Sequence, residues 1–520
     1  MKVRNLLEGI GAALLLAPYY LPFLPPGNHA IYHHGLPITN VMGGFLLDLI
    51  GISILSTGFL VAAQHLCQPM QRILEALFAG LMLWSILGMA LQVMTRLQLS
   101  VANWIHLRGQ FVLAVLLLSG VLAWLLPRHT QLAVRAVRLA VAAFAFSSLW
   151  IVPQLLHLML IRPPVRSPAS AHLPAQAHGN SRQRIIWILF DELSYDQTFD
   201  HRAPGIRLPN FDRLRAQSLS FSNLKPVGYL TNRIIPSLIS GNEFHEFRST
   251  IDGQLSTLDE SQHRWIAYDP NATLFGVAQR KGWNSGVDGW FIPYCNTFAP
   301  LLNVCYWYPG EFLPTEEYGA SEGNSMLSNA AAAPNQLLAV LTNRAKTPAD
   351  IHMEAFRYLM ANTQTLIDDN QIGFVFLHLP VPHPPGIYDR QRHLLRSGGT
   401  YLDNLVLADD VLGVLMKEID ATPSAGQTTV IVSSDHSWRL PLWRPAEGWS
   451  GEEERASEGK FDDRPVLLIH FPRQASSQDV NAALPEMLEH EIIADMLNGK
   501  MNNPEDLEAL LSSANRSGQF

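Results

Sequence analysis

Acidic residues and a histidine stand directly after two apolar segments that lie far apart in the sequence. Asp191 and Glu192 follow RIIWILF, and Asp435 and His436 follow TTVIVSS. Carboxylate oxygens and an imidazole nitrogen form a donor set that suits zinc or manganese. We therefore predict a divalent metal site with Glu192, Asp435 and His436 as ligands and Asp191 as a further ligand or close contributor. Zinc is the first expectation, and manganese, magnesium and calcium are the alternatives.

A single threonine could be the nucleophile of such a site. Thr231 stands ten residues before Gly241 in the segment TNRIIPSLISG. A cation beside its hydroxyl would favour the alkoxide, which is both a metal ligand and a usable nucleophile. Asn232 and Arg233 could donate hydrogen bonds to developing negative charge if a helix begins here, although Arg233 could equally pair with a carboxylate. If Thr231 is not the nucleophile, Ser237 or a metal-bound water is the next candidate.

Three further polar residues are candidate contacts of the substrate. His383 lies in HLPVPHPP and is expected to hold negatively charged oxygens of a substrate or to protonate a leaving group, because imidazole titrates near neutral pH. A loop histidine packed between prolines is the alternative for this residue. His378 is predicted to be structural or to support substrate binding, and Lys460 is a candidate substrate contact.

One segment resembles the sulfatase family. The segment LPNFDRLRAQSLSFSN is similar to a sulfatase phrase that follows the first metal-binding strand. In sulfatases a modifiable Cys or Ser stands ten residues before a glycine, where this chain has Thr231, and threonine cannot become formylglycine. The Pro and Arg expected two and four positions later are Arg233 and Ile235. A threonine nucleophile instead resembles the membrane-anchored branch of the alkaline-phosphatase-like superfamily, the phosphoethanolamine and phosphoglycerol transferases.

This resemblance covers nearly the whole chain and implies an activity. It implies transfer of a phospho-head group from a membrane phospholipid to an envelope glycan or lipid, through a phospho-threonine. A phosphodiesterase or sulfuric-ester hydrolase with water as acceptor is the alternative, and a non-catalytic membrane scaffold is the second. In these transferases a histidine often stands just before the proline of the last core strand. This chain has Asp463 there, which makes Asp463 a candidate metal ligand.

Continuous apolar segments must position these residues. We predict an α/β sandwich whose single central sheet contains four buried, parallel strands, near Ile185–Phe190, Phe374–Leu377, Val430–Ser433 and Val466–Ile469. In an open α/β sheet, ligands bind beyond the carboxyl ends of the strands. The candidate residues above should therefore meet at that edge.

The first part of the chain has the composition of a membrane domain. Five segments are long enough to span a bilayer, which takes about 20 helical residues, and they are Asn5–Leu24, Val41–Leu66, Ile73–Val93, Phe111–Leu126 and Leu139–Leu160. A cleaved signal peptide is the alternative for the first segment. We predict a transmembrane domain over residues 1–162, a linker over 163–183, and a catalytic domain over 184–520.

Basic residues between the spans predict the orientation of the domain in the membrane. The connections on one side carry Lys2, Arg4, Arg72, Arg128, Arg135 and Arg138, and those on the other carry Arg96 and Arg108. The amino terminus is therefore expected in the cytoplasm. With five spans, the enzyme would be a multi-pass protein of the inner (plasma) membrane with its catalytic domain in the periplasm.

Cysteine spacing and net charge limit the remaining possibilities. Cys295 and Cys305 lie close together in the predicted extracytoplasmic domain, which favours a disulfide over two free thiols. The formal net charge of −8 argues against a nucleic-acid partner, because phosphate binding needs clustered Lys and Arg.

Overall fold

Two units make up the chain. A computed structural model describes residues 3–17, 24, 38–96, 109–125, 127–160, 183–249, 255–259, 263–292, 294–308, 325–327, 330–331, 347–446, 448–458 and 460–517. One unit consists mainly of residues 1–163, and the other consists mainly of residues 164–520. Almost all of the predicted linker, 163–183, lies outside the described residues, so its structure stays a prediction.

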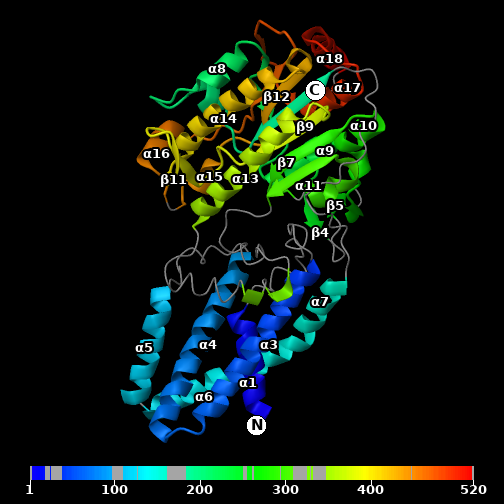
Figure 1. Cartoon of the computed structure of the whole chain (residues 1–520). Coiled ribbons are helices and arrows are strands. Elements are labelled where there is room, and N and C mark those ends of the chain that lie inside the picture. Colours follow the sequence, from blue (N-terminus) through cyan, green and yellow to red (C-terminus); the bar gives the residue numbers. More distant parts are fainter. Residues whose placement is uncertain are drawn as a thin grey trace. The chain divides into compact units, whose positions relative to one another are not determined.

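Helices form almost all of the described part of the first unit (Figure 1). They are α1 (Val3–Leu16), α3 (Ile38–Ala63), α4 (Gln68–Arg96), α5 (Gly109–Leu125), α6 (Pro127–Phe144), η3 (Ala145–Ser147) and α7 (Ser148–Leu160). Three helical stretches are long and apolar enough to cross a membrane, namely Thr39–Ala63, Gln68–Ala90 and Thr130–Leu160. The protein is therefore membrane-associated. The described parts of α1 and α5, at 14 and 17 residues, are shorter, so the count of five spans stays a prediction.

The segment expected to connect the last two spans is helical. We expected a loop between Leu126 and Leu139, but α6 begins at Pro127 and continues through η3 into α7. Arg138 lies inside this helix and is buried. Its guanidinium donates to Glu8 Oε2 through Nε at 2.9 Å and Nη2 at 2.7 Å, and Nη1 lies 2.8 Å from Glu75 Oε1. Burying the Arg138 charge alone would be costly, and the ion pairs with Glu8 and Glu75 compensate it. The segment can therefore remain helical.

We predict that replacing Arg138 with Met destabilises the helical unit. Removing one partner of a buried ion pair leaves an uncompensated charge and typically costs about 3–5 kcal/mol. Thermal unfolding of the full-length protein in detergent should show a lower melting temperature for Arg138→Met. Arg4→Met is a suitable control, because the Arg4 side chain is 59% exposed although it also pairs with Glu8. Equal melting temperatures for both variants and the wild type would contradict the prediction.

The second unit is an α/β domain. Its larger helices are α8 (Pro209–Arg215), α9 (Thr231–Ser240), α10 (Leu274–Arg280), α13 (Pro348–Asp368), α14 (Tyr401–Ala421), α16 (Gly451–Ser457), α17 (Leu488–Leu497) and α18 (Pro504–Ser517). Shorter helical turns are η4 (Asp196–Asp200), η5 (Pro270–Ala272), α11 (Tyr294–Phe298), η6 (Ala299–Leu301), η8 (Ala425–Gln427) and α15 (Leu440–Trp443).

An eight-stranded sheet forms the centre of this domain, in the order β14-β2-β13-β12-β1-β9-β7-β8. These strands are β1 (Arg184–Phe190), β2 (Leu219–Phe221), β7 (Ser285–Trp290), β8 (Val304–Tyr308), β9 (Phe374–Leu379), β12 (Thr428–Ser434), β13 (Leu467–His470) and β14 (Gln478–Val480). Smaller sheets pair β10 (Gly386–Asp389) with β11 (Leu394–Gly399), β3 (Leu224–Lys225) with β15 (Leu484–Pro485), and β4 (Phe247–Ser249) with β5 (Leu255–Asp259) and β6 (Arg264–Ala267).

All four predicted strands lie in the large sheet, as β1, β9, β12 and β13, which confirms the predicted α/β fold. One detail of the prediction was wrong, because β13 runs antiparallel to β12. The chain leaves β12 at Ser434, remains near that edge through α15 and α16, and enters β13 at Leu467 from the same side. Because β13 begins at the edge of the sheet where β12 ends, it must run in the opposite direction.

Helices cover both faces of the sheet because successive residues of a strand point to opposite sides. In β1, Ile185, Trp187 and Leu189 pack into a core with α9, α10 and α17. Ile186, Ile188 and Phe190 pack into a second core with α8, α13 and α14. Both layers are visible in Figure 1. Burial on both faces explains why this strand has a continuous apolar sequence rather than an alternating one.

The predicted disulfide is confirmed. Cys295 in α11 and Cys305 in β8 are bonded to each other, and Cys67 is a free, exposed cysteine. The bond closes a loop that joins α11 to the edge strand β8. It therefore ties the edge of the large sheet to a helix that packs into one of its cores.

Candidate functional site

The carboxyl edge of the three central strands gathers the candidate residues. The strands β12, β1 and β9 are adjacent and parallel, and they end at Ser434, Phe190 and Leu379. Asp191 and Asp435 are the next residues after β1 and β12, and both are fully buried. Their position follows from the strand order, because neighbouring parallel strands bring their carboxyl ends together.

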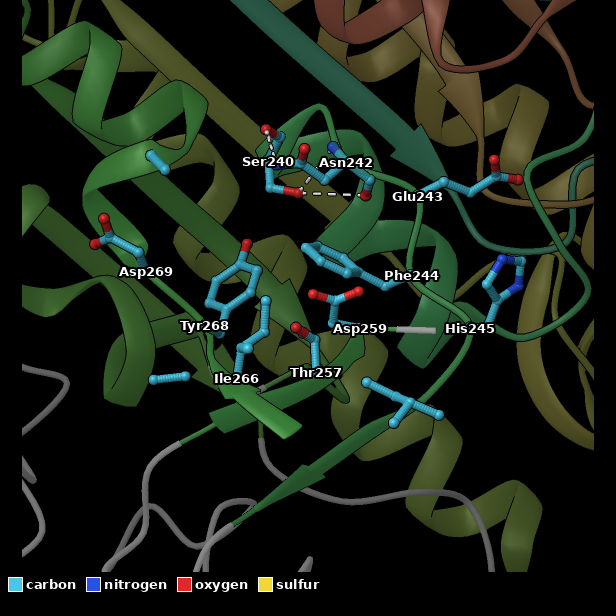
Figure 2. A pocket seen from close by; sticks show the side chains of 13 residues that line it. Ser240, Asn242, Glu243, Phe244, His245, Thr257, Asp259, Ile266, Tyr268 and Asp269 are labelled. Carbon is cyan, nitrogen blue, oxygen red and sulfur yellow. Dashed lines mark hydrogen bonds between the residues drawn. The ribbon is translucent and has the colours of Figure 1, made fainter. Parts of the chain in front are cut away.

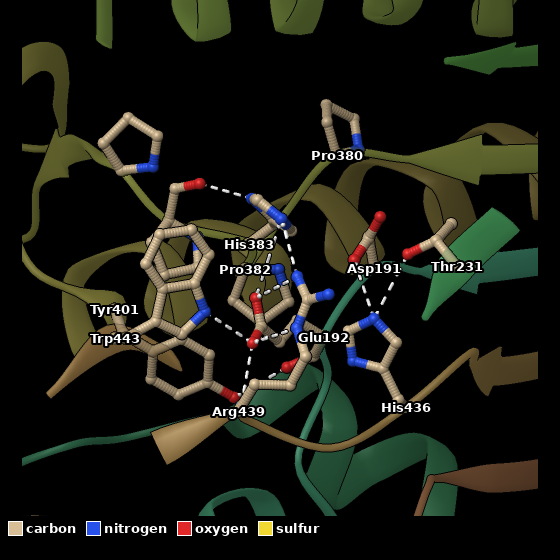
Figure 3. Close-up of polar contacts among 12 residues, drawn as sticks. Asp191, Glu192, Thr231, Pro380, Pro382, His383, Tyr401, His436, Arg439 and Trp443 are labelled. Carbon is tan, nitrogen blue, oxygen red and sulfur yellow. Dashed lines mark hydrogen bonds and ion pairs between the residues drawn. The ribbon is translucent and has the colours of Figure 1, made fainter. Parts of the chain in front are cut away.

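Thr231 lies among the side chains at this edge (Figure 3). Its hydroxyl Oγ1 is 2.7 Å from Asp435 Oδ2 and 3.2 Å from His436 Nε2. His436 Nε2 is also 3.1 Å from Asp435 Oδ2 and 3.8 Å from Asp191 Oδ1. Asp191, Asp435 and His436 form a group whose ligand atoms are close enough to hold one metal ion. We call these three residues the cation group.

The chemistry of the cation group fits a divalent cation. Neither carboxylate oxygen of Asp191 accepts a hydrogen bond from the described residues, although the side chain is fully buried. Burial and the nearby Asp435 carboxylate raise the pKa of Asp191 well above its ordinary value. Burial alone would also raise the pKa of Asp435, but the His436 imidazole outweighs it and lowers this pKa. A cation bound here would compensate two carboxylates that otherwise repel each other in a buried space.

Glu192 faces a different partner from the one predicted. Its carboxylate Oε1 accepts hydrogen bonds from Arg439 N at 2.8 Å, Arg439 Nε at 3.0 Å and Trp443 Nε1 at 2.7 Å. Burial would raise the pKa of Glu192, but the Arg439 guanidinium outweighs it and lowers the pKa. We predicted Glu192 beside Asp435 and His436, with Asp191 as contributor, whereas the structure places Asp191 in that position. The reason is that Arg439, which the sequence analysis did not consider, pairs with Glu192.

An arginine lies next to a second group of possible metal ligands. Asp191, Glu192 and His383 also offer ligand atoms within metal-binding distance of one another. In this structure, however, Arg439 Nη2 donates to His383 Nε2 at 2.9 Å and lies 3.4 Å from Glu192 Oε2. Figure 3 shows the guanidinium between these two side chains. The protein's own cation therefore neutralises Glu192 here.

His383 accepts a hydrogen bond rather than donating one at Nε2. Arginine is always a donor, so His383 Nε2 must be unprotonated, and burial lowers the pKa of His383 to about 4. This geometry favours holding a neighbouring group over protonating a leaving group. No sequence pattern predicted a role for His352. It contacts the carbonyl oxygens of Pro380 and Pro385 at 2.8 and 2.9 Å and so fixes the segment on both sides of His383.

His378 lies next to the cation group from the side of β9. Its Nδ1 is 2.8 Å from the Tyr294 hydroxyl, and its Nε2 is 3.5 Å from Asp191 Oδ2. Burial lowers the pKa of His378 to about 4, so the ring is neutral near pH 7. A neutral ring held by Tyr294 can orient Asp191. The structural or supporting role expected for His378 stays a prediction.

The remaining predicted site residues are exposed or partly exposed. Asp463 is exposed and belongs to neither group of possible metal ligands within the described part of the chain. Lys460 is 82% exposed and lies 3.4 Å from Glu458. Asn232 is exposed and Arg233 is partly exposed in the first turn of α9. The Arg233 side chain makes no ion pair with any described residue, so the alternative of a carboxylate partner has no support among them.

The helix α9 begins at the candidate nucleophile. Thr231 is its first residue, so the amino-terminal end of the helix lies at this hydroxyl. The helix ends at Gly241, whose φ of 75° suits glycine. Ser237 is buried, donates to Arg233 O at 2.7 Å and accepts from Phe244 N at 3.0 Å. Its hydroxyl is therefore engaged in the helix end, which leaves Thr231 as the hydroxyl at the cation group.

A buried glutamate supports the loop that carries Thr231. Glu486 Oε2 accepts a hydrogen bond from Val227 N at 2.7 Å, and the backbone N–H of Glu486 donates to Lys225 O at 2.9 Å. Burial raises the pKa of Glu486 well above its ordinary value. The sequence contained no signal for this contact, because Glu486 belongs to no recognisable motif. Arg439 could have been considered, since it stands four residues after Asp435 in SSDHSWR.

We predict that Asp435→Asn loses both bound metal and turnover. Asp435 contacts Thr231 and His436, so the amide removes the charge that a cation would need. Elemental analysis of the purified full-length protein should find divalent metal in the wild type and at least about tenfold less in the variant. Asp463→Asn is the matched control and should retain both metal and turnover. Loss of metal in Asp463→Asn with retention in Asp435→Asn would reverse this assignment.

We predict that protonation of His383 destabilises the protein in acid. The ordinary pKa of histidine is 6.5, and the folded-state pKa of His383 is lowered to about 4. The unfolded chain therefore binds this proton first, so the stability contribution is complete above about pH 6.5 and is lost as the pH falls toward 4. The full effect is about 3 kcal/mol. The wild type should lose more thermal stability than His383→Gln between these pH values, and parallel losses would contradict the prediction.

One family model and several solved structures are similar to this chain. The sulfatase family model matches residues 183–487. A search of the curated proteins gives no match. A phosphonate monoester hydrolase of Agrobacterium radiobacter aligns with 61% of this chain and 74% of its own, at 13% identity and a TM-score of 0.37. A protein in the alkaline phosphatase superfamily from Vibrio parahaemolyticus aligns with 66% of this chain and 74% of its own, at 14% identity and a TM-score of 0.34.

A third solved structure is murine ectonucleotide pyrophosphatase/phosphodiesterase 5 in complex with AMP. It aligns with 62% of this chain and 96% of its own, at 13% identity and a TM-score of 0.34. The match to the family model extends from the start of β1 to the segment that supports the Thr231 loop, and so it includes the whole cation group. Because that match covers more than half of the sequence, the chain belongs to the sulfatase family.

Proposed function

We propose that this protein is a metal-dependent enzyme that transfers a phospho-head group through a covalent phospho-threonine at Thr231. The donor would be a membrane phospholipid, the group phosphoethanolamine or phosphoglycerol, and the acceptor an envelope glycan or lipid. One observation carries the proposal: the Thr231 hydroxyl lies within hydrogen-bonding distance of Asp435 and His436 at the start of a helix. A formylglycine sulfatase needs Cys or Ser at this position.

Asp191, Asp435 and His436 would hold the divalent cation, with zinc as the first choice for a mixed oxygen and nitrogen donor set. Manganese, magnesium and calcium are the alternatives. Such a cation supplies positive charge that lowers the pKa of an adjacent hydroxyl. Asp435 Oδ2 accepts the hydrogen bond of the Thr231 hydroxyl at 2.7 Å and so orients Oγ1 for attack.

The reaction would proceed in two displacements at phosphorus. Thr231 Oγ1 forms a bond to phosphorus, and the bond from phosphorus to the lipid oxygen breaks, so that the lipid alcohol leaves with a proton. The oxygen of an acceptor hydroxyl then forms a bond to phosphorus, the bond from phosphorus to Thr231 Oγ1 breaks, and the proton of the acceptor passes to Oγ1 to restore the threonine hydroxyl. Water in place of this acceptor would make the same site a phosphodiesterase, which is the alternative function.

Two cationic groups could bind the phosphoryl oxygens. Arg233 stands two residues after Thr231 and has no ion pair with a described residue, so its charge is available to a phosphate. The helix α9 adds the N–H groups of its first turn. Arg439 is held by Glu192 and His383, which fixes its guanidinium in one orientation. Asn232 is exposed in the same turn and could contact the head group.

The predicted location of the enzyme agrees with a lipid donor. Helices that can cross a membrane would keep the protein at the bilayer that contains its substrate. The disulfide between Cys295 and Cys305 suits an oxidising compartment. We propose a multi-pass protein of the inner membrane with its α/β domain in the periplasm.

We predict that Thr231→Ala abolishes turnover, lowering it by at least about a thousandfold, while the metal remains bound. The three members of the cation group are unchanged in this variant, so elemental analysis should still find metal. Ser237→Ala is the matched control on the same helix, because its hydroxyl contacts only backbone groups of the helix end. Turnover of Thr231→Ala at a rate comparable to that of the wild type would refute the covalent mechanism.

Labelled phospholipid distinguishes the transferase from the hydrolase. Full-length protein in lipid vesicles is incubated with head-group-labelled phospholipid, with and without cell-envelope glycans and lipids. Transfer of the label to an envelope component, and labelled Thr231 in a rapidly quenched sample, are expected. Release of labelled head group to water alone, at the same rate with and without acceptors, would support the hydrolase instead.

A further inference from the structure

A pocket lies beside the small three-stranded sheet of the α/β domain (Figure 2). Its volume is about 440 Å³, which is within the range of small-molecule sites. Its walls come from the segment after α9, from β5 and β6, and from the residues that follow β6. The proposed phosphotransfer at Thr231 makes no use of it.

A buried hydroxyl without a partner points into this pocket. Thr257 in β5 is 1% exposed, and its Oγ1 forms no hydrogen bond with any described residue. Thr257 and Asp259 lie on the same face of β5, because side chains alternate along a strand. Figure 2 shows both side chains directed into the pocket, with Phe244 and Tyr268 beside them. A buried polar group normally has a hydrogen-bonding partner, and a ligand in the pocket would supply one.

The charges of the walls favour a cationic ligand. Three carboxylates line the pocket, those of Glu243, Asp259 and Asp269, and no Lys or Arg is among the lining residues. The Asp269 carboxylate already accepts hydrogen bonds from Asn271, and Arg264 opposes Asp259 across the two strands. Of the three carboxylates, that of Glu243 is exposed. The carboxyl-terminal end of α9 also contributes partial negative charge.

Two aromatic rings form the apolar part of the wall. The ring centroids of Phe244 and Tyr268 are 6.0 Å apart, at an interplanar angle of 66°. Aromatic faces next to carboxylates bind organic cations through cation–π contacts and through the apolar surface of the ligand. The pocket therefore offers a ligand three features. The two rings form an apolar surface, the carboxylates supply negative charge, and the Thr257 hydroxyl supplies one hydrogen-bonding group.

We propose that this pocket binds a small organic cation that also carries hydroxyl groups, such as an amino sugar. The ammonium group lies near the carboxylates, a hydroxyl group pairs with Thr257, and the carbon skeleton contacts the two rings. The pocket contains Ser240, the last residue of α9, whereas Thr231 is the first. These ten residues span about 14 Å, so a ligand can occupy the pocket separately from the nucleophile. The proposal goes beyond the proposed function and does not depend on it.

Binding of glucosamine to the full-length protein in detergent tests this proposal, with glucose as the neutral counterpart. At about pH 6.5 an ammonium of ordinary pKa is charged and carboxylates are ionised. Saturation-transfer NMR and calorimetric titration should detect glucosamine, with glucose at least about tenfold weaker. Thr257→Val and Glu243→Gln should each weaken glucosamine binding several-fold, and Ser256→Ala, on the opposite face of β5, should not.

Three results would overturn the proposal. They are equal binding of glucose and glucosamine, wild-type affinity in both Thr257→Val and Glu243→Gln, and no binding of glucosamine at millimolar concentration. Should Thr257→Val fail to fold, the exposed Glu243 still decides the matter through Glu243→Gln. Because the measurement is binding and not turnover, its outcome is independent of the reaction at Thr231.

Discussion

Two buried carboxylates at the edge of the central sheet impose the main constraint on this site. Asp191 and Asp435 follow neighbouring strands, are fully buried, and both interact with the His436 ring. Like charges in a buried space repel each other and raise the pKa of one partner, as they do for Asp191. A cation would remove this repulsion, and the proposed metal would supply it. The Thr231 hydroxyl lies where such a cation would act on it.

The buried charge of Glu192 is compensated by side chains of the protein itself. Glu192 is also buried, but the Arg439 guanidinium and the Trp443 indole N–H compensate its charge. His383 remains neutral and accepts a hydrogen bond from the same guanidinium. A fixed arginine can bind phosphoryl oxygens without a second metal, because it carries a permanent positive charge and directional donors. In this structure the Arg439 guanidinium therefore compensates the charge of Glu192.

Packing and hydrogen bonds around the site fix the segments that carry its side chains. Apolar side chains cover both faces of the sheet and fix the strand ends. Glu486 holds the loop before Thr231, and His352 contacts the segment on both sides of His383. Catalytic geometry depends on such supporting contacts, because a shift of about 1 Å in a reacting group can lower the rate by about a hundredfold. The same helix that presents Thr231 ends at the acidic pocket, which gives the domain a second candidate binding site.

The sequence by itself determined the fold and most of the residues at the site. Continuous apolar segments predicted the four strands, and the residues directly after them predicted a site with Glu192, Asp435 and His436 as ligands and Asp191 as a further contributor. Only the tertiary structure decided which carboxylate faces Thr231, because consecutive residues such as Asp191 and Glu192 point in different directions at a strand end. It also identified Arg439 as the partner of Glu192 and left Asp463 exposed. Local sequence limits which residues reach an edge of the sheet, whereas the partner of a buried charge depends on side chains that are distant in the chain and meet only after folding.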